Sequence, residues 1–252
     1  MTSFAAAAEL LQPLLLAFFL TFCRVGAAFF AFPAFTGHLP LQSRVGIGLA
    51  VSLPVSVAAG SPAIGVGAAE AVSAIMANVT VGLWLGLSGR LLLAAFHAGG
   101  QLIGQATGLY NPFPSSGFAF EGSTVVSAMM VTAGTALVFA SDMHVHFIVA
   151  VAGSFQAVAI DGAPDPAVLN AGIVSVVSTA FRLAIQFAAP FLVLGLVFNL
   201  ALGVANRMMP ALPVYFVFSP VMIGLGLFLL VLTFGAMAAA FSGEMSRLIE
   251  GL

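Results

Sequence analysis

Five ionisable side chains stand inside or at the ends of long apolar runs, and their positions make them the first candidates for chemistry. Charge inside a membrane segment is costly, so such residues usually face protein or a water-filled cavity. Each could mark a functional site, form a structural ion pair, or place an arginine head group at the membrane surface. The five are Arg24, Glu70, Arg90, Arg182 and Arg207.

Glu70 and Arg90 cannot pair with each other. They are predicted to lie on one helix, and the residues between them span about 30 Å at about 1.5 Å per residue. Each must therefore face a different partner.

Asp142, His144 and His146 form a cluster that has some features of a metal site. Histidines at i and i+2 point to different faces of a helix, and no further Cys, His or Glu lies nearby. Asp142 follows Ser141 at an expected helix junction, and Asp is favourable at a helix N-terminus. We interpret Asp142 as a helix cap and expect no metal here.

Other common sites have no matching pattern in this chain. The sequence lacks P-loop, Rossmann and HExxH motifs, and its single cysteine, Cys23, excludes an internal disulfide. No acid/base pair lies on a polar face, and no basic patch suits nucleic acid. We expect no catalytic residue, no cofactor and no nucleic-acid partner.

The elements that carry these residues are long apolar helices. Residues 208–243 contain no charged residue, whereas about 20 apolar residues of helix suffice to cross a bilayer. The whole chain is 62% hydrophobic and 6% charged, with a mean hydropathy of +1.19. The pattern lacks the alternation of a membrane β-barrel. It predicts an all-α polytopic membrane protein, a single domain over residues 1–252.

Proline and glycine divide the chain into six hydrophobic segments. The segment 99–122 is rich in glycine, proline and aromatic residues, and we expect irregular backbone there. Residues 242–252 should form a polar tail. The spacings Gly82-x-x-x-Gly86 and Gly100-x-x-x-Gly104 permit close helix packing, although they also arise by chance in apolar chains. The expected helices cover about residues 10–32, 45–59 (interrupted by Pro54), 67–97, 123–141 with a further stretch to 159, 169–202, and 215–241.

Four segments together carry a resemblance to a known family. FCRVGAAFFAFPAFTGHLPLQSRVGIGLAVSLPV (22–55) resembles the opening of the FliR family of flagellar export-gate proteins, with matching positions at Arg24, Pro33, Leu39-Pro40 and Arg44. HAGGQLIGQATGL (97–109), SDMHVHFIVAVAGSF (141–155) and ANRMMPALPVYFVFSPVMIGLGL (205–227) continue the match. Injectisome proteins share the fold, and Asp142-Met143-His144 is more similar to the flagellar branch.

The resemblance implies a channel-forming subunit of a type III secretion export gate. Such a subunit would assemble with FliP- and FliQ-type proteins into a hetero-oligomeric helical core. The core would lie in the bacterial inner membrane, within the flagellar basal body, and pass unfolded flagellar proteins. Residues of about 172–241 would form a FliQ-like helical hairpin.

The same resemblance suggests two groups of site residues. A loop of this family helps to close the pore, and the matching stretch here contains the plug candidates Tyr110, Phe113, Phe118 and Phe120. Other residues are expected to contact neighbouring subunits, because the chain offers few acidic partners for its arginines. These assembly candidates are Arg24, Arg44, Glu70, Arg90, Arg207 and Pro210.

Two other classes of function stay open at this point. A secondary transporter of a small solute would suit the irregular segment 99–122 and the charges within spans, but no inverted repeat is visible. An intramembrane enzyme lacks a plausible Ser/His, Asp/Asp or zinc set.

Overall fold

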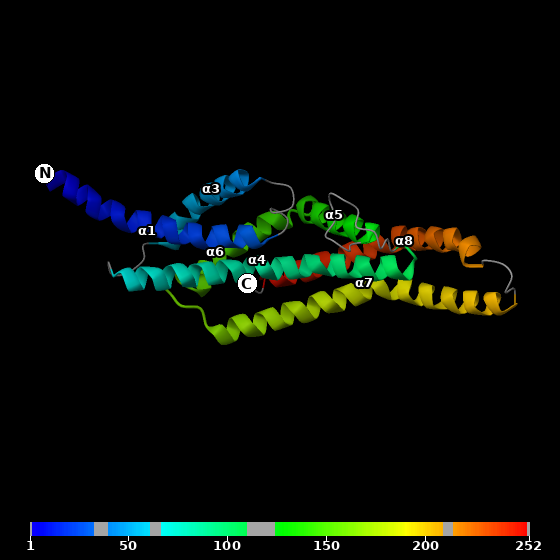
Figure 1. The fold of residues 1–252 in the computed structure, drawn as a ribbon. Helices are drawn as coiled ribbons and strands as arrows, with labels where there is room; N and C mark the ends of the chain where they lie inside the picture. Colours follow the sequence, from blue (N-terminus) through cyan, green and yellow to red (C-terminus); the bar gives the residue numbers. More distant parts are fainter. Residues whose placement is uncertain (1, 33–39, 61–66, 110–123, 209–213, 251–252) are drawn as a thin grey trace. The chain divides into compact units, whose positions relative to one another are not determined.

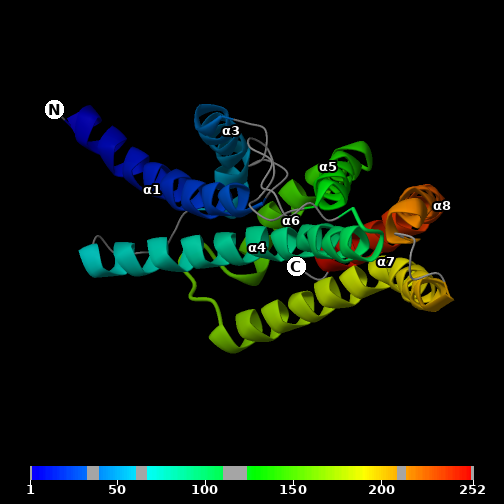
Figure 2. The ribbon, with the colours of Figure 1, turned by 45° about the vertical axis from the view of Figure 1, so that its right-hand side comes forward.

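The structure is a computed structural model that describes residues 2–32, 40–60, 67–109, 124–208 and 214–250. Every regular element within these residues is an α-helix, so the predicted all-helical fold is confirmed (Figures 1 and 2). In chain order the helices are α1 (Thr2–Ala31), α3 (Leu41–Ala59), α4 (Ala68–Ala106), α5 (Val125–Ala140), α6 (Met143–Ala157), α7 (Pro166–Met208) and α8 (Val214–Glu250).

Within the described residues, five helices are long and apolar enough to cross a membrane, namely α1, α3, α4, α7 and α8. The α5–α6 pair, broken at residues 141–142, is a sixth candidate if it counts as one span. This agrees with the prediction of about six apolar helices. Helices α4, α7 and α8, with 39, 43 and 37 residues, exceed the length of one perpendicular span, so they tilt or extend beyond the hydrocarbon core.

Proline and glycine break the helices less often than predicted. Helix α1 ends at Ala31, two residues before Pro33, because a residue next to proline avoids helical backbone. Helix α3, however, continues through Pro54. Helix α4 likewise continues to Ala106 and includes Gly99, Gly100 and Gly104, so the prediction of irregular backbone is wrong for residues 99–106.

The predicted polar tail is wrong for residues 242–250, which continue helix α8 to Glu250. Phe241 and Met245 are fully buried there. These two apolar side chains, one turn apart, hold the end of the helix against the protein.

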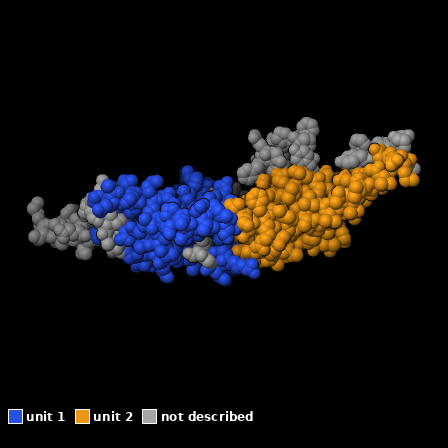
Figure 3. Space-filling view, turned by 90° about the horizontal axis from the view of Figure 1, so that it is seen from below, with its two compact units in different colours: residues 1–91, 142–176, 245–252 blue, residues 92–141, 177–244 orange. Residues whose placement is uncertain are grey.

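The chain divides into two compact units, which Figure 3 colours separately. Unit 1 comprises residues 1–91, 142–176 and 245–252, and unit 2 comprises residues 92–141 and 177–244. In unit 1, Phe32 stacks on Phe147 of α6 with ring centroids 4.3 Å apart. In unit 2, Phe96 of α4 contacts Phe187 of α7 at 5.0 Å and Phe241 of α8 at 4.9 Å.

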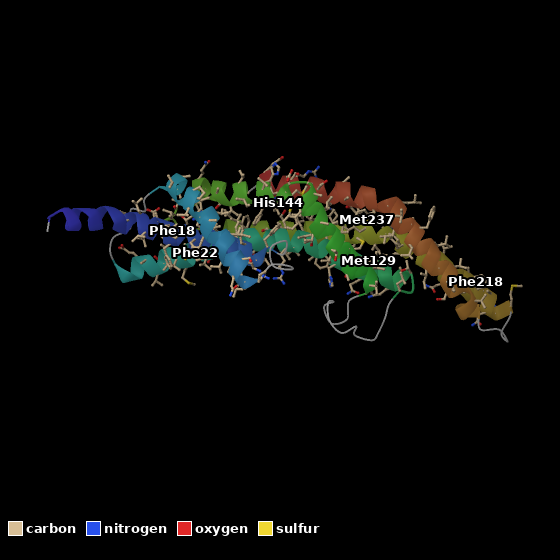
Figure 4. All side chains as sticks on the ribbon, turned by 90° about the horizontal axis from the view of Figure 1, so that it is seen from above. Phe18, Phe22, Met129, His144, Phe218 and Met237 are labelled. Atoms are coloured by element: carbon tan, nitrogen blue, oxygen red, sulfur yellow. The ribbon has the colours of Figure 1, made fainter. Side chains whose placement is uncertain are left out.

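Small residues bring α1 close to two of its neighbours in unit 1, namely α4 and α3. A Cβ atom on Gly82 of α4 would overlap the backbone carbonyl oxygen of Arg24, and one on Gly86 would overlap that of Ala28. On α3, Gly48 lies against the ring of Phe22, which is labelled in Figure 4. The Gly82-x-x-x-Gly86 spacing is therefore a real packing motif and not a chance pattern.

The second glycine pair has the same role in unit 2. A Cβ atom on Gly100 would lie 2.6 Å from Cα of Ser127, and one on Gly104 would lie 2.6 Å from Oγ1 of Thr124. Both contacts bring α4 against the start of α5. Glycine that looked like a helix breaker in the sequence instead permits close approach of two helices.

Candidate functional site

Arg24 of α1 is the most deeply buried charged residue among those described, with 0% of its surface exposed. Because α1 approaches α4 closely at Gly82, the Arg24 side chain can reach Asn78, which lies one turn earlier on α4. Asn78 is also fully buried. A charged group can remain at such a position only if protein atoms replace the water around it.

The guanidinium of Arg24 finds its partners on α4, on α6 and in the residues after α6. Its Nε donates to Oδ1 of Asn78 at 2.9 Å. Nη1 donates to the carbonyl oxygens of Ser154 at 3.1 Å and Val158 at 2.9 Å, and lies 3.3 Å from Oγ of Ser154. Nη2 donates to the carbonyl oxygen of Ala159 at 3.3 Å. The group also lies over the ring of Phe155, 3.9 Å from its centroid.

These contacts make Arg24 a cap for the C-terminus of α6. Ser154 lies in the last turn of that helix and Val158 is its C-terminal cap residue. Carbonyl groups at the C-terminus of a helix carry partial negative charge, and that of Ser154 accepts from the backbone N–H of Val158 as well as from Arg24. The helix end thus offsets the positive charge, and none of these partners is a carboxylate.

Asn78 orients this arrangement. Its Nδ2 donates to the carbonyl oxygens of Ala74 and Ile160, both at 2.8 Å. Because both amide protons are engaged, Oδ1 is left to accept from Arg24. The cluster ties α1, α4 and the segment after α6 together within unit 1.

Arg24 was a candidate from the sequence, and its partners were expected to come from other subunits. In the structure they come from its own chain, because the carbonyl groups at the end of α6 can accept where no carboxylate is available. Asn78 was missed. The feature of the sequence that could have revealed it is that Asn78 is the one amide side chain in the charge-free run 71–89.

Arg182 of α7 also has a partner within its own unit. Its Nη2 lies 2.6 Å from Oε1 of Glu244 on α8, with 54% and 15% of the two side chains exposed. Sequence reasoning had placed Glu244 in a polar tail, away from Arg182. The continuation of α8 through this residue corrects that placement.

A smaller polar cluster joins α4 to α5 in unit 2. Oγ of Ser127 lies 2.9 Å from Nδ1 of His97, and it donates to the carbonyl oxygen of His97 at 3.1 Å. Thr124 donates to the carbonyl oxygen of Gly100 at 3.2 Å and accepts from the backbone N–H of Ser127 at 3.0 Å, which caps α5. Sequence reasoning missed this cluster, although Gly100 and Gly104 marked the place.

The remaining charged candidates lie nearer the surface. Glu70 is exposed in the first turn of α4 and Arg207 is exposed in the last turn of α7, ends that favour a negative and a positive charge respectively. Arg44 is half-buried near the start of α3, and Arg90 is exposed on α4. Pro210 and the plug candidates Tyr110, Phe113, Phe118 and Phe120 lie outside the described residues.

Asp142 is the N-terminal cap residue of α6, as predicted, but its backbone conformation, and not a side-chain hydrogen bond, suits it to this position. It has left-handed backbone with φ 54°, and its side chain makes no capping hydrogen bond. Asp tolerates this conformation better than most residues, so it allows the break between α5 and α6. Nδ1 of His146 lies 3.1 Å from the Asp142 carbonyl oxygen, and Figure 4 labels His144 on the same helix.

Comparison with known proteins assigns the chain to a protein family. The model of the family described as bacterial export proteins, family 1, matches residues 15–248. The chain belongs to this family. It is 34% identical to the flagellar biosynthetic protein FliR of Caulobacter vibrioides over 178 residues, which cover 70% of each protein.

Two further relatives are also FliR proteins. The chain is 29% identical to the flagellar biosynthetic protein FliR of Pectobacterium carotovorum over 215 residues, covering 83% of this chain and 81% of the relative. It is 25% identical to that of Escherichia coli K12 over 192 residues, covering 75% and 74%. The resemblance to the FliR family stated from the sequence is confirmed.

Proposed function

We propose that this chain is the FliR-type subunit of a flagellar type III export gate in the bacterial inner membrane. The observation that carries the proposal is the family match over residues 15–248, together with relatives named as flagellar biosynthetic proteins. The long apolar helices fit an integral membrane protein.

The exposed surfaces of the helices support a subunit that packs laterally against others. In an 18-residue apolar stretch of each helix, only 17% of the stretch in α3, 22% in α7 and 17% in α8 is buried within the chain. Val57 on α3 is 84% exposed and Val231 on α8 is 77% exposed. Such surfaces suit contact with other membrane helices or with lipid.

The proposed partners are FliP- and FliQ-type subunits and other membrane proteins of the export apparatus within the basal body. Together they would form a channel for unfolded flagellar proteins. Residues 172–241, of which 172–208 lie on α7 and 214–241 on α8, would act as a FliQ-like hairpin. Arg44, Glu70, Arg90, Arg207 and Pro210 are proposed assembly contacts.

The polar clusters described above favour a structural role over a catalytic one. The groups around Arg24 and His97 are engaged in bonds that join helices. The proposed action of the subunit is therefore to line and close a channel, with the stretch around Tyr110, Phe113, Phe118 and Phe120 as its plug.

Gene deletion in the bacterium that makes this chain tests the proposal. The deletion should abolish secretion of flagellar filament protein and swimming, and the chain returned on a plasmid should restore both. In detergent, the tagged chain should purify in a large hetero-oligomer. A deletion strain with normal filaments that loses uptake of a small solute would support a transporter and refute the export function.

A further inference from the structure

Between residues 73 and 90, which lie in unit 1, helix α4 leaves one narrow sector exposed. Between residues 73 and 90, the exposed positions alternate in spacings of three and four residues. At about 100° per residue they fall within a sector about 100° wide. The seam, as we name this sector, consists of Ser73, Met76, Thr80, Leu83, Leu87 and Arg90.

The chemistry of the seam suits close contact with another helix. Met76, Leu83 and Leu87 are 62%, 43% and 38% exposed and supply apolar surface. The hydroxyl groups of Ser73 and Thr80 already donate to carbonyl oxygens of α4 itself, so they present only small side chains outward. Three-four spacing of this kind lets the side chains of two helices interdigitate at a shallow crossing angle.

Arg90 supplies the charge that identifies the partner. Its side chain is exposed, and it has no hydrogen bond or ion pair with any residue that the structure describes. It lies within the candidate span Ala69–Ala106, and residues 91–106 that follow it contain no charged residue. Arg90 thus stands between two apolar runs, where an unpaired charge is costly.

We propose that the seam docks a membrane-spanning helix of another gate subunit, and that this helix carries a carboxylate opposite Arg90. The inference rests on the proposed function and adds to it the chemistry of one partner. The seam is about 26 Å long at about 1.5 Å per residue, which approaches the thickness of a bilayer core. One helix is wide enough to cover it.

Charge reversal in the assembled gate tests the proposed pair. The full-length chain is co-expressed with the membrane subunits encoded beside it, and the intact complex is purified through a tag. Arg90→Glu should reduce the yield of complex by about tenfold or more, because one like-charged pair is left buried. Arg90→Lys should reduce the yield less, since it keeps the charge.

Reversal of the partner charge completes the test. Each Asp or Glu within a predicted span of the co-expressed subunits is changed to Arg in the Arg90→Glu background. One such change should restore the yield, and Leu87→Cys should form a disulfide with a cysteine placed one turn from that position, in a Cys23→Ala background. If Arg90→Glu assembles like wild type, or no reversal restores assembly, the proposal is overturned.

Two controls separate a docked helix from lipid. Leu87→Trp should reduce the yield of complex, whereas Val149→Trp, at an exposed position of α6, should change it less. A nitroxide label at Leu83 in the assembled complex should collide rarely with dissolved oxygen. Frequent collisions would mean that the seam faces lipid chains, with Arg90 bound to head-group phosphate, and would overturn the proposal.

The deletion strain described above, complemented with the wild-type chain or with Arg90→Glu, distinguishes failure of this inference from failure of the proposed function. If the wild-type chain does not restore secretion, the export function itself is refuted. If the wild type restores secretion and Arg90→Glu restores it equally, only the helix docked on the seam is refuted.

Discussion

The guanidinium of Arg24 is neutralised by the end of a helix, whereas that of Arg182 faces a carboxylate at the surface. The two arginines therefore differ in what they contribute to the fold. Arg24 is fully buried and each of its nitrogen atoms has a partner. Arg182 is 54% exposed, so water competes with Glu244 for its charge.

Replacing Arg24 should strongly destabilise the protein. Arg24→Leu removes the donor to the Val158 carbonyl oxygen and to Oδ1 of Asn78, whereas the Ser154 and Ala159 carbonyls keep backbone donors. Each buried unsatisfied group costs about 1–3 kcal/mol. Arg24→Lys should cost less, because it keeps the charge but loses the planar fork. The measurement is thermal unfolding of the purified gate in detergent. Arg182→Gln is the control, with an expected cost of about 0–1 kcal/mol, and equal losses for both residues would contradict this account.

Arg207 should act through its place in the last turn of α7. A guanidinium there can donate to the free carbonyls of the helix end. Arg207→Ala should reduce assembly or secretion, and Arg207→Lys should restore it only in part. The readout is secreted flagellar protein per cell. Equal secretion by all three proteins would leave Arg207 as a simple anchor at the membrane surface.

The sequence indicated which charged residues matter more clearly than it indicated their bonding partners. Arg24 stands out as a charge within an apolar run, and Arg182 does so as well. Their partners are distant in sequence, since Arg24 bonds to residues 54 to 135 positions away and Arg182 to one 62 positions away. A carbonyl acceptor also leaves no mark in the sequence, because every residue has one.

At the scale of elements, two glycine pairs on α4 set how closely its neighbours approach. Gly82 and Gly86 admit the backbone of α1, and Gly100 and Gly104 admit the start of α5. The helical segments and most of their order followed from hydropathy and proline positions. The course of α4 beyond residue 97 did not, because glycine both breaks helices and permits their close packing. Only the neighbour of each glycine decides between these roles.

A methyl group on Gly82 should force α1 away from α4. Gly82→Ala places Cβ against the carbonyl oxygen of Arg24, and overpacking of this kind costs about 1–3 kcal/mol. Gly153 of α6 has open space around it, so Gly153→Ala is the matched control in the same unit. That control should be neutral or slightly stabilising, since Ala favours helix over Gly. Thermal unfolding compares the two variants, and equal stability would show that the helices can separate without cost.

At the scale of the whole molecule, exposed apolar surface matters more than uncompensated charge. The sequence suggested that the arginines need partners from other subunits, because the chain has few acidic residues to balance them. Arg24 and Arg182 nevertheless find partners within the chain. What stays exposed is large hydrophobic surface on α3, α7 and α8, such as Val57, Leu196 and Val231.

The chain expressed alone should therefore not form a stable monomer. Exposed apolar surface of this extent favours association unless lipid or partner subunits cover it. Size-exclusion chromatography in mild detergent should show mixed aggregates for the chain alone and a single large peak after co-expression with its gate partners. A monodisperse and thermostable monomer would count strongly against a role as a gate subunit.

Removal of the proposed plug should change permeability without changing assembly. Apolar rings close a narrow pore by excluding water, and the stretch contains Phe113, Phe118 and Phe120. Deletion of residues 113–120 should give an assembled gate that leaks ions or small dyes. A deletion complex that assembles and stays as tight as wild type would refute the plug. Loss of assembly without leak would assign the stretch to subunit contact.

The bonds of Arg24 have a consequence for how the chain is made. Its partners at Ser154 and Ala159 are synthesised 130 and 135 residues later. At about 5–20 residues per second, this gap lasts on the order of ten seconds. During that time α1 has emerged from the ribosome with its cation unsatisfied. The first helix made can pack against α3 and α4 early but completes its contacts late, and Arg24 depends on water, lipid head groups or the insertion machinery until α6 arrives.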